Sequence, residues 1–337
     1  MAIWNTLTFA LAVGLAQVPT QAPEAATALA LAKAYGFTDA EMEKVFRGDV
    51  LAKALSEGSD KELAGVAAVW LPKSVSEFAD ITLEGELLKL DPTIRSLHVW
   101  RLGESADEAI SALRVDAAEQ AALQGRQEAY RKNGLKGAGT PGELLALAIK
   151  ETDLLAHAPG YTQALLDFPA EPLPGMQHRF FAYDQDVEGQ RTFVLSHRAA
   201  VRSAHHALIT EQRYYVSRTY LCRFVVSDCF DVRGGTLVFY VTRLFTDQVA
   251  GVGSSLKHAI GRRRMLSDVV AKQKRVRQQL AAGAQGLPLR RGGGAQHPRA
   301  IAMHHEVQLH PSRTRRLGGA RLRSEKPGRR VPNTASR

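Results

Sequence analysis

Residues 254–280 constrain the fold most, because their apolar side chains recur at helical spacing with Arg and Lys between them. The apolar positions are Leu256, Ile260, Leu266, Val269, Val270, Val276 and Leu280. Ser254-Ser255 supplies a helix start, and such a helix would be about 37 Å long. A helix of this length with one apolar face has to lie across an apolar surface, and a β-sheet is the partner that the preceding residues offer.

The segment before this helix has the composition of β-strands. Thr192–Val201, Arg213–Asp231 and Thr236–Phe245 are rich in β-branched and aromatic residues, and each is predicted to form one strand. The turn-forming residues Arg233-Gly234-Gly235 separate the last two, which predicts a hairpin. We therefore expect antiparallel strands beneath the long helix.

The N-terminal half adds strands and short helices. Val50–Leu55 and Leu63–Trp70 are apolar stretches that flank a turn-forming cluster, so they predict another hairpin, and Ile94–Leu102 predicts a further strand. Thr38-x-x-Glu41 and Ser74-x-x-Glu77 are capping boxes, in which side chains bind the free backbone N–H groups at a helix start. Each box predicts a short helix.

Residues 104 to about 170 predict a helical insertion. Ala106–Lys132 is rich in Ala, Glu and Gln, Thr140-Pro141-Gly142-Glu143 starts a helix that ends near Thr152, and Pro159–Asp167 adds another. The predicted fold class is therefore α+β: an antiparallel sheet packed on a long C-terminal helix, with a helical insertion. We expect residues 23–280 to form a single domain, since the 45% apolar content suits a sizeable core.

The first 22 residues have the layout of a signal peptide. A short polar start precedes the apolar run Leu7–Ala16, and small residues permit cleavage after Ala16 or Ala22. The run is too short to span a bilayer, which requires about 20 apolar residues, so no permanent membrane anchor is expected. The first Lys is Lys33, and a buried N-terminal helix is the alternative interpretation. A signal peptide implies a periplasmic or extracellular protein.

The net charge of +10 comes from the C-terminal tail. Residues 281–337 hold 12 of the 44 Lys and Arg residues and two of the 34 acidic residues, so residues 1–280 are electrically neutral. The tail is also rich in Gly and Pro and has no aromatic residue, which predicts disorder. It is a frameshifted or unselected extension, a solvated tail, or an arm that binds a polyanion. Export makes nucleic acid an unlikely partner.

The two cysteines, Cys222 and Cys229, are predicted to be packed or free thiols. Both fall in a segment that reads as one strand, and extended chain between them would span about 23 Å. A disulfide tolerates Cα separations only up to about 7 Å. The spacing also lacks the Cys-x-x-Cys pattern of redox and zinc sites.

No motif marks a catalytic, metal or cofactor site. Gly251–Ser255 precedes a helix but lacks the phosphate-binding patterns, and plain helix capping explains it. His305 and His310 are five residues apart, one more than a helical zinc site requires, and His205-His206 are adjacent residues whose side chains diverge. We expect no catalytic residues, no metal and no cofactor, and do not predict an enzyme.

The order of these elements resembles the helix-grip fold of START and polyketide-cyclase proteins, in which a curved antiparallel sheet wraps the last helix. The strings Ser59–Leu63 leading into AGVAAVWLP, and Leu237–Arg243 leading through Thr246-Asp247 to the long helix, are similar to a family of uncharacterised bacterial exported proteins. The resemblance covers about residues 40–280.

The resemblance implies a binding protein that holds an apolar small molecule or lipid between sheet and C-terminal helix. Candidate cavity residues are the large apolar and aromatic side chains on the relevant elements, each of which could equally be core: Tyr215, Tyr220, Phe224, Phe239 and Ile260. The alternative is an interaction protein that contacts anionic lipid or another polyanion through Arg262–Arg264, Lys272 and the neighbouring cations of the last helix, and through the tail. A hydrolase or cyclase would need a His or acid in the cavity, which no motif supports.

Overall fold

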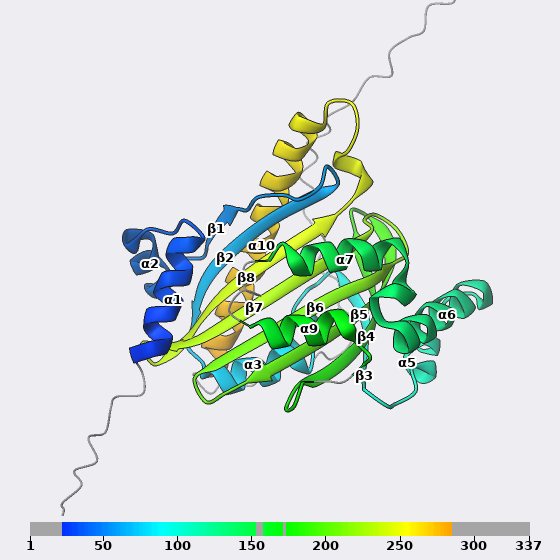
Figure 1. The fold of residues 1–337 in the computed structure, drawn as a ribbon, viewed down its shortest axis with the longest axis horizontal. Coiled ribbons are helices and arrows are strands. Elements are labelled where there is room, and N and C mark those ends of the chain that lie inside the picture. Colours follow the sequence, from blue (N-terminus) through cyan, green and yellow to red (C-terminus); the bar gives the residue numbers. More distant parts are fainter. Residues whose placement is uncertain (1–21, 153–157, 171–172, 285–337) are drawn as a thin grey trace, which may run out of the picture. The chain divides into compact units, whose positions relative to one another are not determined.

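The computed structural model describes residues 22–152, 158–170 and 173–284 (Figure 1). The elements in chain order are α1 (Ala22–Ala34), α2 (Asp39–Phe46), β1 (Leu51–Ala54), β2 (Glu62–Leu71), α3 (Val75–Leu83), α4 (Glu86–Lys89), β3 (Ile94–Arg101), α5 (Asp107–Ser111), α6 (Ala117–Asn133), the 3-10 helix η1 (Gly134–Ala138), α7 (Thr140–Lys150), α9 (Pro159–Asp167), β4 (Gln177–Val187), β5 (Gln190–Arg202), β6 (His206–Val216), β7 (Cys222–Val232), β8 (Gly235–Phe245), the 3-10 helix η2 (Asp247–Val249) and α10 (Ser254–Ala284).

The described strands form one antiparallel sheet in the order β1-β2-β8-β7-β6-β5-β4-β3. Strands β3 to β8 lie next to one another in the order of the sequence. The whole of β2 then pairs with β8, from Glu62 opposite Phe245 to Leu71 opposite Thr236. The helices α3 and α4 lie between β2 and β3 in the sequence, and α10 follows β8. This is a helix-grip-like α+β fold, so the fold class predicted from the sequence is confirmed.

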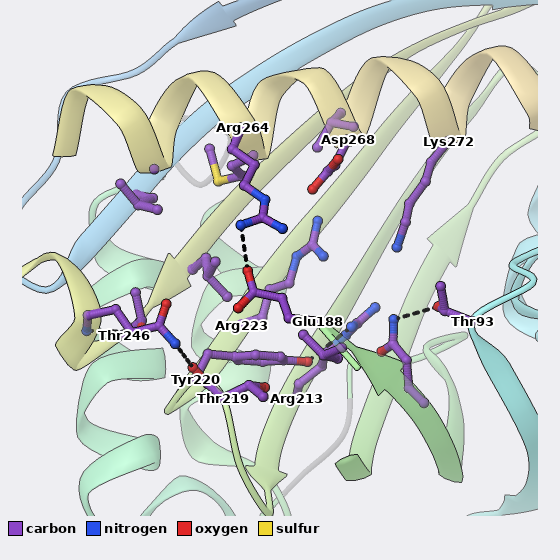
Figure 2. Close-up of a pocket in the computed structure, with 18 of the residues that line it drawn as sticks. Thr93, Glu188, Arg213, Thr219, Tyr220, Arg223, Thr246, Arg264, Asp268 and Lys272 are labelled. Carbon is purple, nitrogen blue, oxygen red and sulfur yellow. Dashed lines mark hydrogen bonds and ion pairs between the residues drawn. The ribbon is translucent and has the colours of Figure 1, made fainter. Parts of the chain in front are cut away.

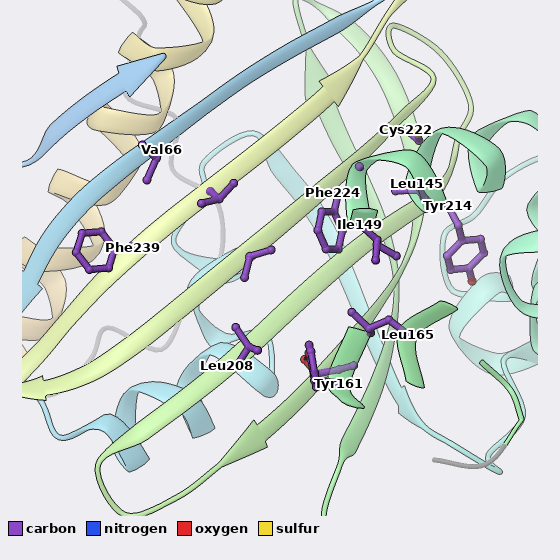
Figure 3. Close-up of a cluster of buried hydrophobic side chains, with 14 of the residues drawn as sticks. Val66, Leu145, Ile149, Tyr161, Leu165, Leu208, Tyr214, Cys222, Phe224 and Phe239 are labelled. Carbon is purple, nitrogen blue, oxygen red and sulfur yellow. Dashed lines mark hydrogen bonds between the residues drawn. The ribbon is translucent and has the colours of Figure 1, made fainter. Parts of the chain in front are cut away.

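Alternate residues of each strand point to opposite faces of the sheet, and helices cover both faces. We call one the insertion face; its core includes Val66, Phe224 and Phe239 under α1, α6, α7 and α9. Figure 3 shows Leu145 and Ile149 of α7 over Phe224. Because both faces are buried, the strands contain nearly continuous runs of buried residues instead of an alternating pattern.

We call the other side the α10 face. Val69, Ile209 and Val238 of the strands pack there against α3, with Leu280 from the end of α10. The helix α10 contacts β2 most extensively (Figure 1). At Gly65 of β2 a Cβ atom would lie 2.4 Å from Cδ2 of Leu266, so the glycine lets the helix approach the strand closely.

Both cysteines lie on β7, on opposite faces of the sheet. Cys222 belongs to the core of the insertion face and Cys229 to that of the α10 face, and both are buried, free thiols. An odd sequence separation within one strand directs the two side chains to opposite sides. The prediction that they pack in the core is confirmed.

Two predicted elements are each divided into two in the structure. Residues 213–231, predicted as one strand, end β6 and begin β7, and the chain reverses between them near Thr219, whose φ is 76°. Residues 106–132, predicted as one helix, are divided into α5 and α6 near Arg114, whose φ is 53°. The left-handed backbone usually requires Gly or Asn, so Thr and Arg gave no turn signal.

Other elements agree with the sequence or were missed by it. The capping boxes at Thr38 and Ser74 are both formed, and α9 has the predicted bounds. No pattern predicted α1 or β4. Of the residues assigned to a signal peptide only Ala22 is described, and the tail beyond residue 284, including His305 and His310, lies outside the described residues.

Candidate functional site

A cavity of about 570 Å³ lies between α10 and the sheet (Figure 2). Strands β2, β4, β6, β7 and β8 supply one wall, and α10 from Lys257 to Arg275 supplies the other. A volume of this size is in the range of small-molecule binding sites, about 300–1,000 Å³. The cavity exists because α10 contacts the sheet mainly at β2 and β1, so the strands farther along the sheet are less closely covered.

Apolar side chains line one end of the cavity. Leu63, Val249 and Met265 are buried together, with Leu244 packed against them, and Val269 continues the apolar lining along α10. These residues come from β2, η2, β8 and α10, and together they present aliphatic surface to the cavity. This end suits an apolar group.

Charged side chains line the other end, and several are paired across it. Arg264 of α10 lies 2.8 Å from a carboxylate oxygen of Glu188 (Figure 2). Nζ of Lys272 lies 2.7 Å from Oδ2 of Asp91. Burial alone would raise the pKa of Asp91, but Lys272 and the hydrogen bonds from Thr93 outweigh burial and lower the pKa to about 2. These pairs connect α10 to loops at the far edge of the sheet.

A buried ionic network lies beneath the charged end. Glu211 accepts hydrogen bonds from Arg198, at 2.6 and 2.9 Å, and from Nε of Arg213 at 2.7 Å. Burial would raise the pKa of Glu211, but the two guanidinium groups outweigh burial and hold the pKa well below its ordinary value. Arg213 also donates to the Tyr220 hydroxyl at 3.2 Å, which fixes that ring at the cavity wall.

A second, smaller cavity of about 100 Å³ adjoins the same residues. Its lining includes Phe78 and Leu87 from the α3–α4 segment and Val276 of α10. Arg213, Arg223 and Lys272 line both cavities. The three cations therefore lie where the two spaces meet.

The structure places the five candidate residues in different surroundings. Tyr220 and Ile260 line the larger cavity, Ile260 at its rim with 60% of its surface exposed. Phe224 and Phe239 lie in the core of the insertion face, and Tyr215 packs against that core with Arg126 over its ring, so these three do not face the cavity. The reason is strand alternation: Arg223 and Tyr240, next to the two phenylalanines, point to the α10 face.

The charged residues of the site are not among the cavity residues that the sequence predicts. Arg213 and Arg223 fall in predicted strands, and Lys272 belongs to the basic stripe of the last helix. A signal did exist: Glu211 and Arg213 are two residues apart in one strand, which puts two charges on the same face. Buried charges require partners, so such a pair indicates an ionic network.

A second polar cluster lies in the insertion face and adjoins neither cavity. Nδ1 of His178 lies 2.9 Å from Nε2 of His197, and Nδ1 of His197 lies 3.0 Å from the Tyr130 hydroxyl. Burial lowers the pKa of both histidines, and their mutual repulsion contributes for His197. Burial also raises the pKa of Cys222 and Cys229, which keeps both thiols protonated.

Among the described residues, no group of three or more His, Cys, Asp or Glu side chains is arranged to hold a metal ion. Among the described helices, none combines the length and apolarity needed to cross a bilayer.

Comparisons with known proteins identify distant structural likeness alone. No protein-family model matches the chain, and no curated protein does. The crystal structure of Ara h 8.0201 is 10% identical, with a TM-score of 0.31, over 66% of this chain and 99% of that one. The di-domain aromatase/cyclase BexL from the BE-7585A biosynthetic pathway is also 10% identical, with a TM-score of 0.24, over 68% of this chain and 75% of that one.

Proposed function

We propose that the protein binds an apolar small molecule, or the acyl part of a lipid, in the larger cavity between α10 and the sheet. One observation carries the proposal: a cavity of about 570 Å³ has an aliphatic end and an opposite end lined by polar and charged side chains. Such a combination is typical of small-molecule sites, because apolar surface provides binding energy and polar groups set orientation. As the predicted signal peptide implies, we propose that binding takes place in the periplasm or outside the cell.

The test is a fluorescence titration of the full chain with the neutral apolar probe N-phenylnaphthylamine. We expect saturable binding to the wild type. Leu244→Trp places a larger side chain in the cavity and should weaken binding at least about tenfold. Leu29→Trp is the matched control, since Leu29 lies on α1 and is 39% exposed. Absence of saturable binding, or equal binding by the Leu244→Trp variant, would contradict the proposal.

A second candidate function is contact with an anionic membrane through the start of α10. Val252, Leu256 and Ile260 are spaced four residues apart and are 97%, 68% and 60% exposed. The neighbouring Arg263 is also exposed, which adds positive charge beside this apolar strip. Arg262, Arg264 and Lys272 pair with acidic residues of this chain, so the basic stripe predicted on α10 is only partly a free surface.

Co-sedimentation with vesicles tests this second function. The full chain should bind phosphatidylglycerol vesicles more than phosphatidylcholine vesicles, and Leu256→Glu should reduce that binding. Equal sedimentation of Leu256→Glu and wild type would exclude the start of α10 as the contact.

A further inference from the structure

The junction of the two cavities carries three cations from separate elements. Arg213 of β6 and Arg223 of β7 are paired directly opposite one another in the sheet, and both line the cavities on the α10 face. Lys272 reaches toward these strands from α10 (Figure 2). We refer to Arg213, Arg223 and Lys272 as the basic cluster. Like charges directly opposite on antiparallel strands repel one another, so this arrangement costs stability.

The carboxylates around the basic cluster do not balance its charge. Arg213 shares the single carboxylate of Glu211 with Arg198, and Lys272 is paired with Asp91. Arg223 donates to two neutral oxygens, Oγ1 of Thr242 at 2.8 Å and the Tyr240 hydroxyl at 3.4 Å. Within the described part of the chain no carboxylate pairs with Arg223. Asp268 also lines the larger cavity, from an exposed position on α10.

The surroundings of Lys272 show the same excess of positive charge. Burial lowers the pKa of Lys272, and repulsion from Arg223 and Arg213 adds to this effect against the attraction of Asp91. Glu188 and Asp186, the other acidic residues of the cavity wall, pair with Arg264 and Arg95. An anion at the junction would receive hydrogen bonds from Arg223 and relieve the repulsion.

We propose that the cavity ligand is an amphiphile whose anionic head, a carboxylate or a phosphate, binds Arg223 within the basic cluster, while its aliphatic part lies against Leu244, Met265 and Val269. This inference rests on the proposed function and specifies the ligand class for the same cavity. The anion recognised is defined by its geometry as well as its charge, because a guanidinium group can donate two parallel hydrogen bonds to two oxygens of one head group.

The experiment compares ligands that differ only in the head group. Isothermal titration calorimetry of the full chain with dodecyl phosphate, dodecanoate and dodecanol separates the contribution of the head group to affinity from that of the alkyl chain. We expect both anionic ligands to bind at least about tenfold more tightly than dodecanol. Arg223→Gln should remove most of that preference, and Arg223→Lys should retain part of it. Arg263→Gln is the control, because Arg263 is an exposed arginine of α10 that lines neither cavity.

Each outcome has a definite meaning. If no ligand binds, the proposed function itself fails. If the wild type binds dodecanol as tightly as the anionic ligands, or if Arg223→Gln keeps the preference, apolar binding stands and the anionic head is excluded. Inorganic phosphate that competes as strongly as dodecyl phosphate would also overturn the inference, because a free anion would then suffice. Circular dichroism spectra and urea unfolding midpoints equal to those of the wild type show that the Arg223 variants are folded.

Discussion

At the scale of single residues, the buried ion pair between Glu62 and Arg243 ties β2 and β8 to the end of α7. Nη1 of Arg243 lies 2.6 Å from Oε1 of Glu62, and the same guanidinium donates to the carbonyl of Glu151 at 2.6 Å. Glu62 is fully buried, so its charge has no access to water. A charge that is buried in this way depends entirely on its partner.

We therefore expect Glu62→Gln to lower the free energy of unfolding by about 3–5 kcal/mol, because Arg243 would be left buried without a counter-charge. Glu86→Gln is the control: Glu86 pairs with Lys89 on the surface of α4, with half of its side chain exposed, and should change stability by less than about 1 kcal/mol. Urea unfolding followed by circular dichroism measures both. Equal effects of the two variants would show that the buried pair is not a structural requirement.

The paired histidines His178 and His197 make stability depend on pH. Burial lowers the pKa of each in the folded protein, whereas histidines of the unfolded chain take up protons near pH 6.5. Their contribution to stability is therefore complete above about pH 6.5 and is lost as the pH falls below that value.

The variant His197→Gln removes one titrating group and should flatten this dependence. Urea unfolding of wild type and variant at several pH values between 7.5 and 5 measures the two slopes. We expect the wild type to lose more stability than the variant over this range. Parallel curves would mean that His197 is protonated as easily in the folded as in the unfolded protein.

At the scale of elements, the contact of α10 with β2 depends on a small residue. A Cβ atom at Gly65 would lie 2.4 Å from Leu266 of α10 and 3.2 Å from the Lys53 carbonyl of β1. Gly65→Val should displace the helix and lower the free energy of unfolding by about 1–3 kcal/mol, although valine favours strands.

The control for Gly65 is Gly125 on α6, where an added Cβ atom meets nothing within 4 Å. Gly125→Ala should raise the free energy of unfolding by about 0.5–1 kcal/mol, because alanine loses less backbone entropy in a helix. Thermal and urea unfolding give both values. A Gly65→Val variant as stable as the wild type would show that α10 does not pack closely on β2.

Some elements could be predicted from the sequence and others could not, for identifiable reasons. The apolar spacing after Ser254 predicts α10, and Arg233-Gly234-Gly235 predicts the β7–β8 hairpin. The β6–β7 turn was missed because Thr219 adopts a left-handed backbone without glycine. Turns of this kind depend on the pairing of the surrounding strands, which local sequence does not report.

At the scale of the whole molecule, the two faces of the sheet differ: side chains on one face form the main core, and side chains on the other line the cavities. The insertion face carries the main core, while the α10 face carries the cavities and their charged residues. The resemblance to the helix-grip fold implies a cavity between sheet and helix, but it does not show which side chains face that cavity. Strands buried on both faces give no alternation from which to choose, so Phe224 and Arg223 could not be assigned to their faces.

The central claim is that the space between α10 and the sheet binds an apolar ligand, and methyl NMR of the full chain tests it most directly. With added dodecanol, the methyl signals of Leu63, Leu244 and Val249 should shift, while those of Leu145 and Val226 in the insertion face should stay in place. Unchanged spectra at saturating dodecanol, or shifts confined to the insertion face, would contradict the claim.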